Sequence, residues 1–178
     1  MTRSAAGAHR IWRLGADIDT DLLAPGAYMK LGIEGIAPHC LEAVRPDFAR
    51  QVQPGDAIAA GPGFGIGSSR EQAAGALRHL GVAAVIAPSY SGLFFRNAFN
   101  LGLLLLTCPE AERLAEGQSV RLDLAAPGAL AVVTDDGQRL ACDPVPDFLL
   151  AMVHAGGLFN LLRRRIDATT LELSLIHI

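Results

Sequence analysis

Residues 57–87 read AIAAGPGFGIGSSREQAAGALRHLGVAAVIA and decide the fold. A short apolar run at 57–60 enters a glycine-rich loop at 61–67. Residues 70–80 carry apolar side chains at helical spacing, and the unbroken apolar run at 82–87 is typical of a buried strand. Strand, glycine loop, helix and strand in this order predict a βαβ unit, and therefore parallel strands in an α/β domain.

The residues that follow the glycine loop are Ser68, Ser69, Arg70 and Glu71. Either serine is a natural N-cap, and Glu71 stands three residues after Ser68, as in a capping box. The loop itself lacks the G-x-G-x-x-G spacing of a dinucleotide site and the lysine of a P-loop. Two interpretations stay open on the residues alone: a simple helix cap, or a carboxylate site built from two hydroxyls, a guanidinium and helix N–H groups.

The flanking sequence extends this unit into a mixed α/β domain with β-rich outer parts. Apolar runs and turn residues predict further strands and helices. We expect strands at 10–14, 103–106, 120–124 and 129–133, a hairpin turn at 135–137, short helices within 33–48, and helices at 93–99, 110–115 and 146–162, the last broken at 156–157.

Composition indicates one globular domain over residues 1–168, with 169–178 as a disordered or vector-derived tail. The chain has 178 residues, of which 51% are hydrophobic and 19% charged. A net charge of -3 offers no basic field for nucleic acid. The basic run 163–165 is expected to end a helix. The longest apolar runs are too short to cross a bilayer and no secretory signal is evident, so we expect a cytoplasmic protein.

The chain has three cysteines, Cys40, Cys108 and Cys142, at wide spacings. No C-x-x-C pair is present, so we expect neither a zinc site nor iron–sulfur ligands, and we assign no metal to this chain. His39 stands beside Cys40, but adjacency in sequence is not a catalytic geometry. A buried structural role is expected for each cysteine.

Asp17, Asp19 and Asp21 place three carboxylates within five residues. Alternate carboxylates could bind Ca²⁺, but the glycine and glutamate of an EF-hand loop are missing at their offsets. We therefore expect these aspartates to pair with arginine or histidine.

Three segments resemble motifs of the aconitase-family small subunits. They read GADIDTDLLAP at 15–25, GFGIGSSREQAA at 63–74 and APSYSGLFFRNAFNLG at 87–102, and the resemblance runs from about residue 10 to about residue 165. It implies the swivel-domain fold, a β/β/α arrangement with a mixed sheet. It also implies a separate large subunit carrying a [4Fe–4S] cluster, and a hydro-lyase that moves water between neighbouring carbons of a small hydroxy di- or tricarboxylate.

The resemblance also implies roles for four residues. Ser68 would be the general base, acting as an alkoxide, which is possible only if cationic and N–H neighbours stabilise the anion. Ser69 and Arg70 would hold a substrate carboxylate. Asp21 would lie near the base or orient a residue of the large subunit.

The loop that reads the variable part of the substrate would be Tyr28, Met29, Lys30 and Leu31. Apolar residues there suit the isopropyl group of isopropylmalate, which is the expected substrate. Lys30 instead suits the extra carboxylate of homoaconitate, or it extends into solvent with its stem on the loop. The alternatives are therefore homoaconitate or a methylated malate, and, outside enzymes, a non-catalytic assembly module.

Overall fold

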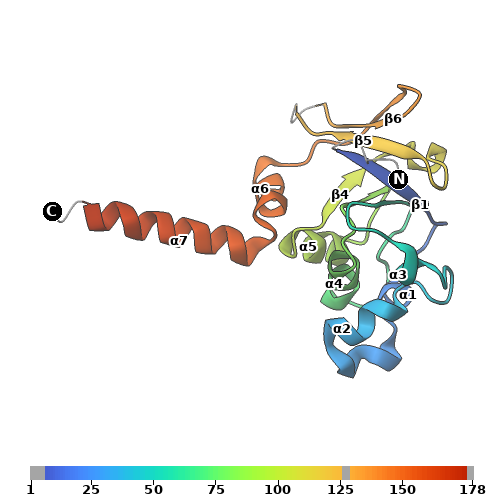
Figure 1. Cartoon of the computed structure of the whole chain (residues 1–178), viewed down its shortest axis with the longest axis horizontal. Coiled ribbons are helices and arrows are strands. Elements are labelled where there is room, and N and C mark those ends of the chain that lie inside the picture. Colours follow the sequence, from blue (N-terminus) through green and yellow to red (C-terminus); the bar gives the residue numbers. More distant parts are fainter. Residues whose placement is uncertain (1–6, 126–128, 176–178) are drawn as a thin grey trace.

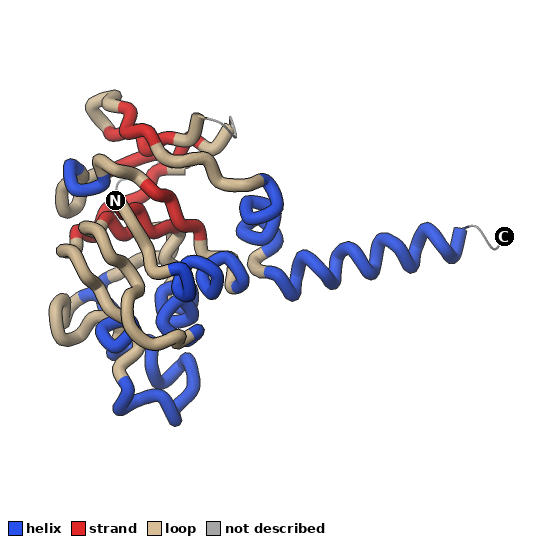
Figure 2. The backbone as a smooth tube through the Cα atoms, turned by 180° about the vertical axis from the view of Figure 1, so that it is seen from behind, coloured by secondary structure: helices blue, strands red, loops and turns tan. Residues whose placement is uncertain are grey.

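The computed structural model describes residues 7–125 and 129–175. Within these residues the strands form one seven-stranded mixed sheet in the order β4-β3-β2-β1-β5-β6-β7. Its parallel half faces a group of helices, its antiparallel half lies at the opposite end of the body, and one long helix extends away (Figures 1 and 2).

The parallel half of the sheet consists of β1 (Ala8–Arg13), β2 (Ala57–Ala59), β3 (Ala84–Ala87) and β4 (Leu104–Thr107). Every residue of β2 and β3 is buried, which explains their unbroken runs of small apolar residues. β2 pairs in parallel with β3, and α4 (Glu71–His79) lies between them in the chain. The βαβ unit predicted from residues 57–87 is confirmed.

The antiparallel half consists of β5 (Ser119–Asp123), β6 (Ala131–Thr134) and β7 (Arg139–Ala141). β1 belongs to both halves, because its second half pairs with β2 and its first half with β5. The predicted hairpin turn at 135–137 is confirmed by antiparallel pairing of β6 with β7.

Helices pack around the parallel half, where α1, α2, α4 and α5 lie together (Figure 1). The helix expected at 93–99 is present. Short helices are also present within 33–48, where Pro38 and Pro46 were expected to break them. Residues 110–115 contain only a single 3-10 turn. The elements are α1 (Thr20–Leu23), η1 (Gly26–Leu31), α2 (Gly32–Ile36), η2 (Ala37–His39), α3 (Phe48–Gln51), α5 (Gly92–Asn100) and η3 (Ala111–Arg113).

The C-terminal region forms α6 (Asp147–Ala155) and α7 (Leu158–Leu175), separated by the predicted break at Gly156. The expectation that the helix ends at the 163–165 arginines was wrong. α7 continues to Leu175, across the boundary expected at residue 168, because no glycine or proline interrupts it. It projects from the body (Figure 1), and no helix in the described ranges is long and apolar enough to cross a membrane.

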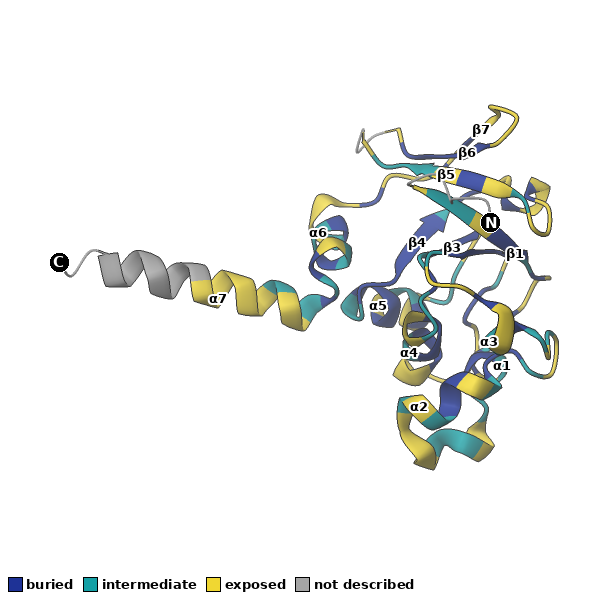
Figure 3. Cartoon of the chain, in the orientation of Figure 1, coloured by how far each residue is buried: buried dark blue, intermediate teal, exposed yellow. Residues whose placement is uncertain are grey.

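The buried side chains form one continuous cluster that extends from β1 to α6 (Figure 3). Phe48, Phe64, Phe94 and Phe99 are among its largest fully buried members. Many of the other buried residues are alanines, and the three cysteines are all buried and free.

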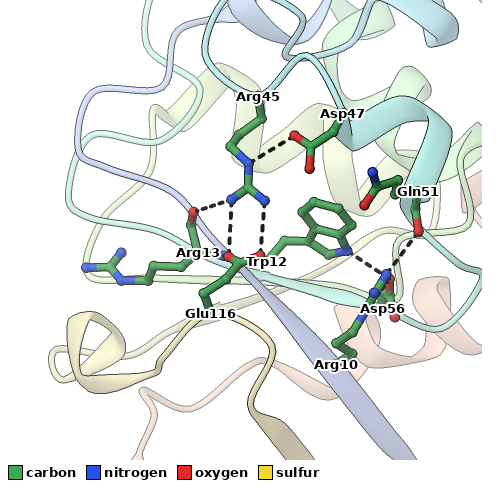
Figure 4. A network of polar contacts seen from close by, with 8 residues as sticks. All are labelled: Arg10, Trp12, Arg13, Arg45, Asp47, Gln51, Asp56 and Glu116. Carbon is green, nitrogen blue, oxygen red and sulfur yellow. Dashed lines mark hydrogen bonds and ion pairs between the residues drawn. The ribbon is translucent and has the colours of Figure 1, made fainter.

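A network of hydrogen bonds and ion pairs surrounds Trp12 at the edge of this core (Figure 4). Asp56 is 6% exposed and accepts hydrogen bonds from Trp12 Nε1 at 2.8 Å, Gln53 N at 2.9 Å and Arg10 Nη2 at 2.6 Å. The guanidinium groups of Arg10 and Arg45 lie 4.9 and 4.8 Å from the Trp12 ring centroid. Burial opposes the charge of Asp56, but these hydrogen bonds outweigh it and hold the pKa of its carboxyl below the ordinary value.

Candidate active site

The glycine-rich loop after β2 is bound on one side to the aspartate-rich segment. Gly65 N donates to the Ile18 carbonyl at 2.7 Å, and Thr20 N donates to the Ile66 carbonyl at 2.9 Å. These bonds join backbones that are almost fifty residues apart in the chain. The loop is therefore held in one conformation by a neighbour that the sequence alone does not place beside it.

The other side of the glycine loop is bound to the segment before α5. Phe64 N donates to the Ser89 carbonyl at 3.1 Å and Ser91 N donates to the Phe64 carbonyl at 2.9 Å. Gly63 N donates to the Ser89 hydroxyl at 2.9 Å. The three segments that carry the sequence motifs thus converge on one loop.

The alternating glycines have a clear steric reason. Gly63, Gly65 and Gly67 have φ values of 77°, 77° and 99°, in the region that favours glycine. A Cβ on Gly65 would lie 2.2 Å from the Phe94 ring. Glycine spaced by two therefore lets the loop curve tightly over α5.

Ser68 and Ser69 leave this loop with exposed side chains. α4 begins at Glu71 with Arg70 as N-cap and without a side-chain cap, so the predicted capping box was wrong. The Ser68 carbonyl accepts from Arg70 N at 2.7 Å and from Thr20 Oγ1, in a distant segment of the chain, at 3.0 Å, and these bonds hold the serine backbone in the loop. Within the described residues neither serine hydroxyl has a partner, so both are available to a ligand.

Arg70 connects this point to α1. Its Nη1 donates to the Asp21 carboxylate and, at 3.0 Å, to the Ala24 carbonyl. The Arg70 side chain is 22% exposed, whereas that of Asp21 is 64% exposed. The hydrogen bond and charge of Arg70 hold the pKa of Asp21 below its ordinary value, so Asp21 is a carboxylate at neutral pH.

The other two aspartates have different surroundings. Asp19 caps α1 by accepting from Leu22 N at 2.8 Å. Asp17 has a positive φ of 55° and its carboxylate lies against Gly63. Pairing is therefore confirmed for Asp21 only, and the described residues contain no group of three or more histidine, cysteine or acidic side chains able to hold a metal.

The loop expected to read the substrate forms η1. Tyr28 and Met29 are half-buried against the core, whereas Lys30 is exposed and Leu31 is 61% exposed. The Tyr28 ring stacks on His39, a contact that the sequence analysis missed. No local pattern in the sequence indicates this stack, because Tyr28 and His39 belong to different short helices.

His39 and Cys40 do not form a reactive pair. Cys40 is fully buried, and this burial raises the pKa of its thiol far above the ordinary value. A thiol in this state is neither a nucleophile nor a metal ligand. The expected structural role of Cys40 fits its surroundings.

Comparison with known proteins shows the family to which this chain belongs. A model of the aconitase C-terminal domain matches residues 44–111. The 3-isopropylmalate dehydratase small subunit of Methanosarcina acetivorans is 40% identical over 159 residues, which is 89% of this chain and 97% of that protein. The chain belongs to the family of 3-isopropylmalate dehydratase small subunits. It is thus a small subunit of an aconitase-family hydro-lyase, as the sequence motifs indicated.

Two further proteins are similar to this chain over most of its length. The crystal structure of 3-isopropylmalate dehydratase from Methanocaldococcus jannaschii superimposes with a TM-score of 0.84 at 33% identity, covering 93% of this chain and 98% of that one. The expected swivel-type fold is confirmed. The methanogen homoaconitase small subunit of Methanothermobacter thermautotrophicus is 41% identical over 160 residues, 89% of this chain and 91% of that protein. The percentage of identical residues is therefore nearly the same for relatives named after isopropylmalate and after homoaconitate, and it does not indicate which acid this chain acts on.

Proposed function

We propose that this chain, together with a large subunit, interconverts 2-isopropylmalate and 3-isopropylmalate by dehydration and rehydration in leucine biosynthesis. One observation carries the proposal: two exposed, unpaired serine hydroxyls lie directly before the N-terminus of α4, beside an arginine held by Asp21. Curated relatives of the 3-isopropylmalate dehydratase type support the choice of reaction.

Ser68 is the proposed base that takes the substrate C–H proton. A serine hydroxyl ionises only where N–H groups and positive charge stabilise the alkoxide. The first N–H groups of α4 have no side-chain cap, and Arg70 supplies a cation next to them. Because Ser68 is exposed at the end of a rigid loop, the alkoxide can reach a substrate held on a partner subunit.

Ser69 and Arg70 are the proposed carboxylate contacts. Nη1 of Arg70 is already bound to Asp21 and Ala24, which fixes the plane of the guanidinium. Its remaining N–H groups can then bind a substrate carboxylate without a large loss of side-chain entropy. Asp21 acts through Arg70 in this proposal, as the group that orients it.

The large subunit is the proposed partner, and it would carry the [4Fe–4S] cluster. When bound, the cluster supplies the Lewis acid that holds the leaving hydroxyl. Within the described residues of this chain all three cysteines are buried and free, and no group of three or more histidine, cysteine or acidic side chains could hold a metal. Free buried thiols also suit a reducing compartment, and we place the enzyme in the cytoplasm.

The substrate loop favours isopropylmalate through Tyr28, Met29 and Leu31, whose side chains offer apolar surface. Lys30 is the observation that supports the second candidate, homoaconitate, because its exposed ammonium could bind a distal carboxylate. Both candidates use the same base and the same carboxylate contacts.

Reconstitution tests the proposal. The chain is purified with its large subunit under anaerobic conditions, and the unsaturated acid formed by dehydration is followed by ultraviolet absorbance. We expect turnover of 3-isopropylmalate with kcat/KM well above that for homoaconitate and for methylated malates. Preference for homoaconitate would assign the second candidate, and absence of turnover with every acid would favour a non-catalytic assembly module.

A further inference from the structure

The segment after α2 contacts the substrate loop through a pair of aromatic rings. The rings of Tyr28 in η1 and His39 in η2 are stacked with centroids 3.5 Å apart and an interplanar angle of 8°. The two rings therefore lie nearly parallel and almost directly over one another. Tyr28 is thus the one member of the substrate loop whose side chain is clamped by another aromatic group in the described structure.

His39 is itself oriented from its other side. Its Nδ1 lies 2.6 Å from Glu42 Oε2, and because a carboxylate accepts, Nδ1 carries the hydrogen. The His39 and Glu42 side chains are 33% and 40% exposed, so this is a partly shielded pair. Burial and the neighbouring Glu42 carboxylate also raise the pKa of the Tyr28 phenol.

The backbone between His39 and Glu42 is strained. Leu41 has a positive φ of 61° although it carries a large side chain, and it is fully buried. Its N–H donates to the Leu22 carbonyl at 2.7 Å, and Glu42 N donates to the His39 carbonyl at 3.2 Å. Such strain persists only where surrounding contacts over-determine it, and it clusters at functional sites.

We propose that His39 is a positioning residue for substrate discrimination: with Glu42 behind it, it holds Tyr28 and thereby fixes η1 against the variable part of the substrate. The inference rests on the proposed function, in which η1 reads that part of the substrate. His39 touches no reacting atom in this account. Its effect falls on the binding of one substrate relative to another, and kcat stays nearly unchanged.

The test uses the reconstituted two-subunit enzyme with His39→Ala, His39→Phe and His39→Gln. Phe keeps a ring for the stack, whereas Ala and Gln remove it. KM and kcat are measured for 3-isopropylmalate and for homoaconitate. We expect Ala and Gln to raise KM for the preferred acid on the order of tenfold and to leave kcat within about twofold. The ratio of kcat/KM values for the two acids should therefore move toward one. His39→Phe should restore most of the preference.

His154→Ala is the matched control, because His154 is exposed on α6 and belongs to neither the loop nor its support. Unchanged KM ratios in both His39→Ala and His39→Gln would overturn the inference. A loss of thermal stability with equal loss of kcat for both acids, unrescued by Phe, would also overturn it in favour of a purely structural role. If Ala does not fold, the comparison of Phe with Gln decides.

The failure of the inference and the failure of the proposed function give different results. A wild-type enzyme that turns over none of the acids refutes the proposed function, and the inference falls with it. A wild-type enzyme that is active, combined with unchanged discrimination in the His39 variants, refutes the inference alone.

Discussion

Arg70, at the start of α4, donates to the carboxylate of Asp21 in α1, which lies 49 positions earlier in the chain. The same nitrogen donates to the Ala24 carbonyl, just before η1 begins. One guanidinium, on the residue that follows the serine pair, therefore binds both the aspartate segment and the backbone that leads into η1. These two contacts orient the Arg70 side chain and lead to the first prediction.

Arg70→Lys should raise KM on the order of tenfold, because the compact ammonium of lysine lacks the planar fork that holds Asp21 and Ala24 through one nitrogen and leaves other N–H groups for a substrate carboxylate. Asp21→Asn should act in the same direction with a smaller effect. If Asp21 acts through Arg70, the double variant should be no worse than Arg70→Lys alone. Steady-state kinetics of the reconstituted enzyme measure this, and additive effects of the two changes would show that Asp21 has a separate role.

Lys30→Val should shift the substrate preference toward isopropylmalate and away from homoaconitate. The change removes the ammonium that could bind a distal carboxylate and adds apolar surface to η1. The measurement is the ratio of kcat/KM values for the two acids. An unchanged ratio would mean that Lys30 extends into solvent and does not read the substrate.

Gly65→Ala should destabilise the fold by about 3 kcal/mol, because the new Cβ would strike the Phe94 ring and the backbone has a positive φ. Urea denaturation followed by circular dichroism measures the free energy of unfolding. Gly15→Ala is the control, since a Cβ there meets nothing within 4 Å. Equal stability of both variants would mean that the glycine loop relaxes easily and is not rigid.

Asp56→Ala should lower the free energy of unfolding by about 3 kcal/mol at neutral pH, because Arg10 and Trp12 lose their buried acceptor. The folded-state pKa of Asp56 is depressed, so its contribution is present above about pH 4 and is lost as the pH falls through the folded pKa. Denaturation at several pH values should therefore show that the free energy of unfolding of the wild type falls toward that of Asp56→Ala at acidic pH.

Asp143→Ala is the control for this change, because Asp143 is exposed outside the network of Figure 4. A constant difference between wild type and Asp56→Ala down to the lowest pH would contradict the assignment of a charged Asp56. A loss of stability in Asp143→Ala of the same size would show that the effect is not specific to the buried carboxylate.

Local sequence patterns predicted the βαβ unit, because buried parallel strands and the helix between them leave strong periodic signals. They did not predict that β1 pairs with β2 on one side and β5 on the other, since pairing between distant strands leaves no local signal. The length of α7 was also missed, because a basic run is only a weak stop signal compared with glycine or proline.

In the candidate site, too, features with a local sequence signal could be predicted and contacts between distant segments could not. The two serines and Arg70 could be selected as candidate site residues from the sequence, because the motif is contiguous. The capping box was wrongly predicted, since the Ser68 carbonyl is held by Thr20, which comes from another segment. The stack of Tyr28 on His39 joins two separate short helices, η1 and η2, and no periodicity indicates such a contact.

The central claim is that this chain supplies the base, and Ser68→Ala in the reconstituted enzyme tests it most directly. We predict a fall in kcat on the order of a thousandfold, with the two-subunit complex still formed on size exclusion and with Ser119→Ala, an exposed serine of β5, unchanged. Full turnover by Ser68→Ala in an intact complex would contradict the claim.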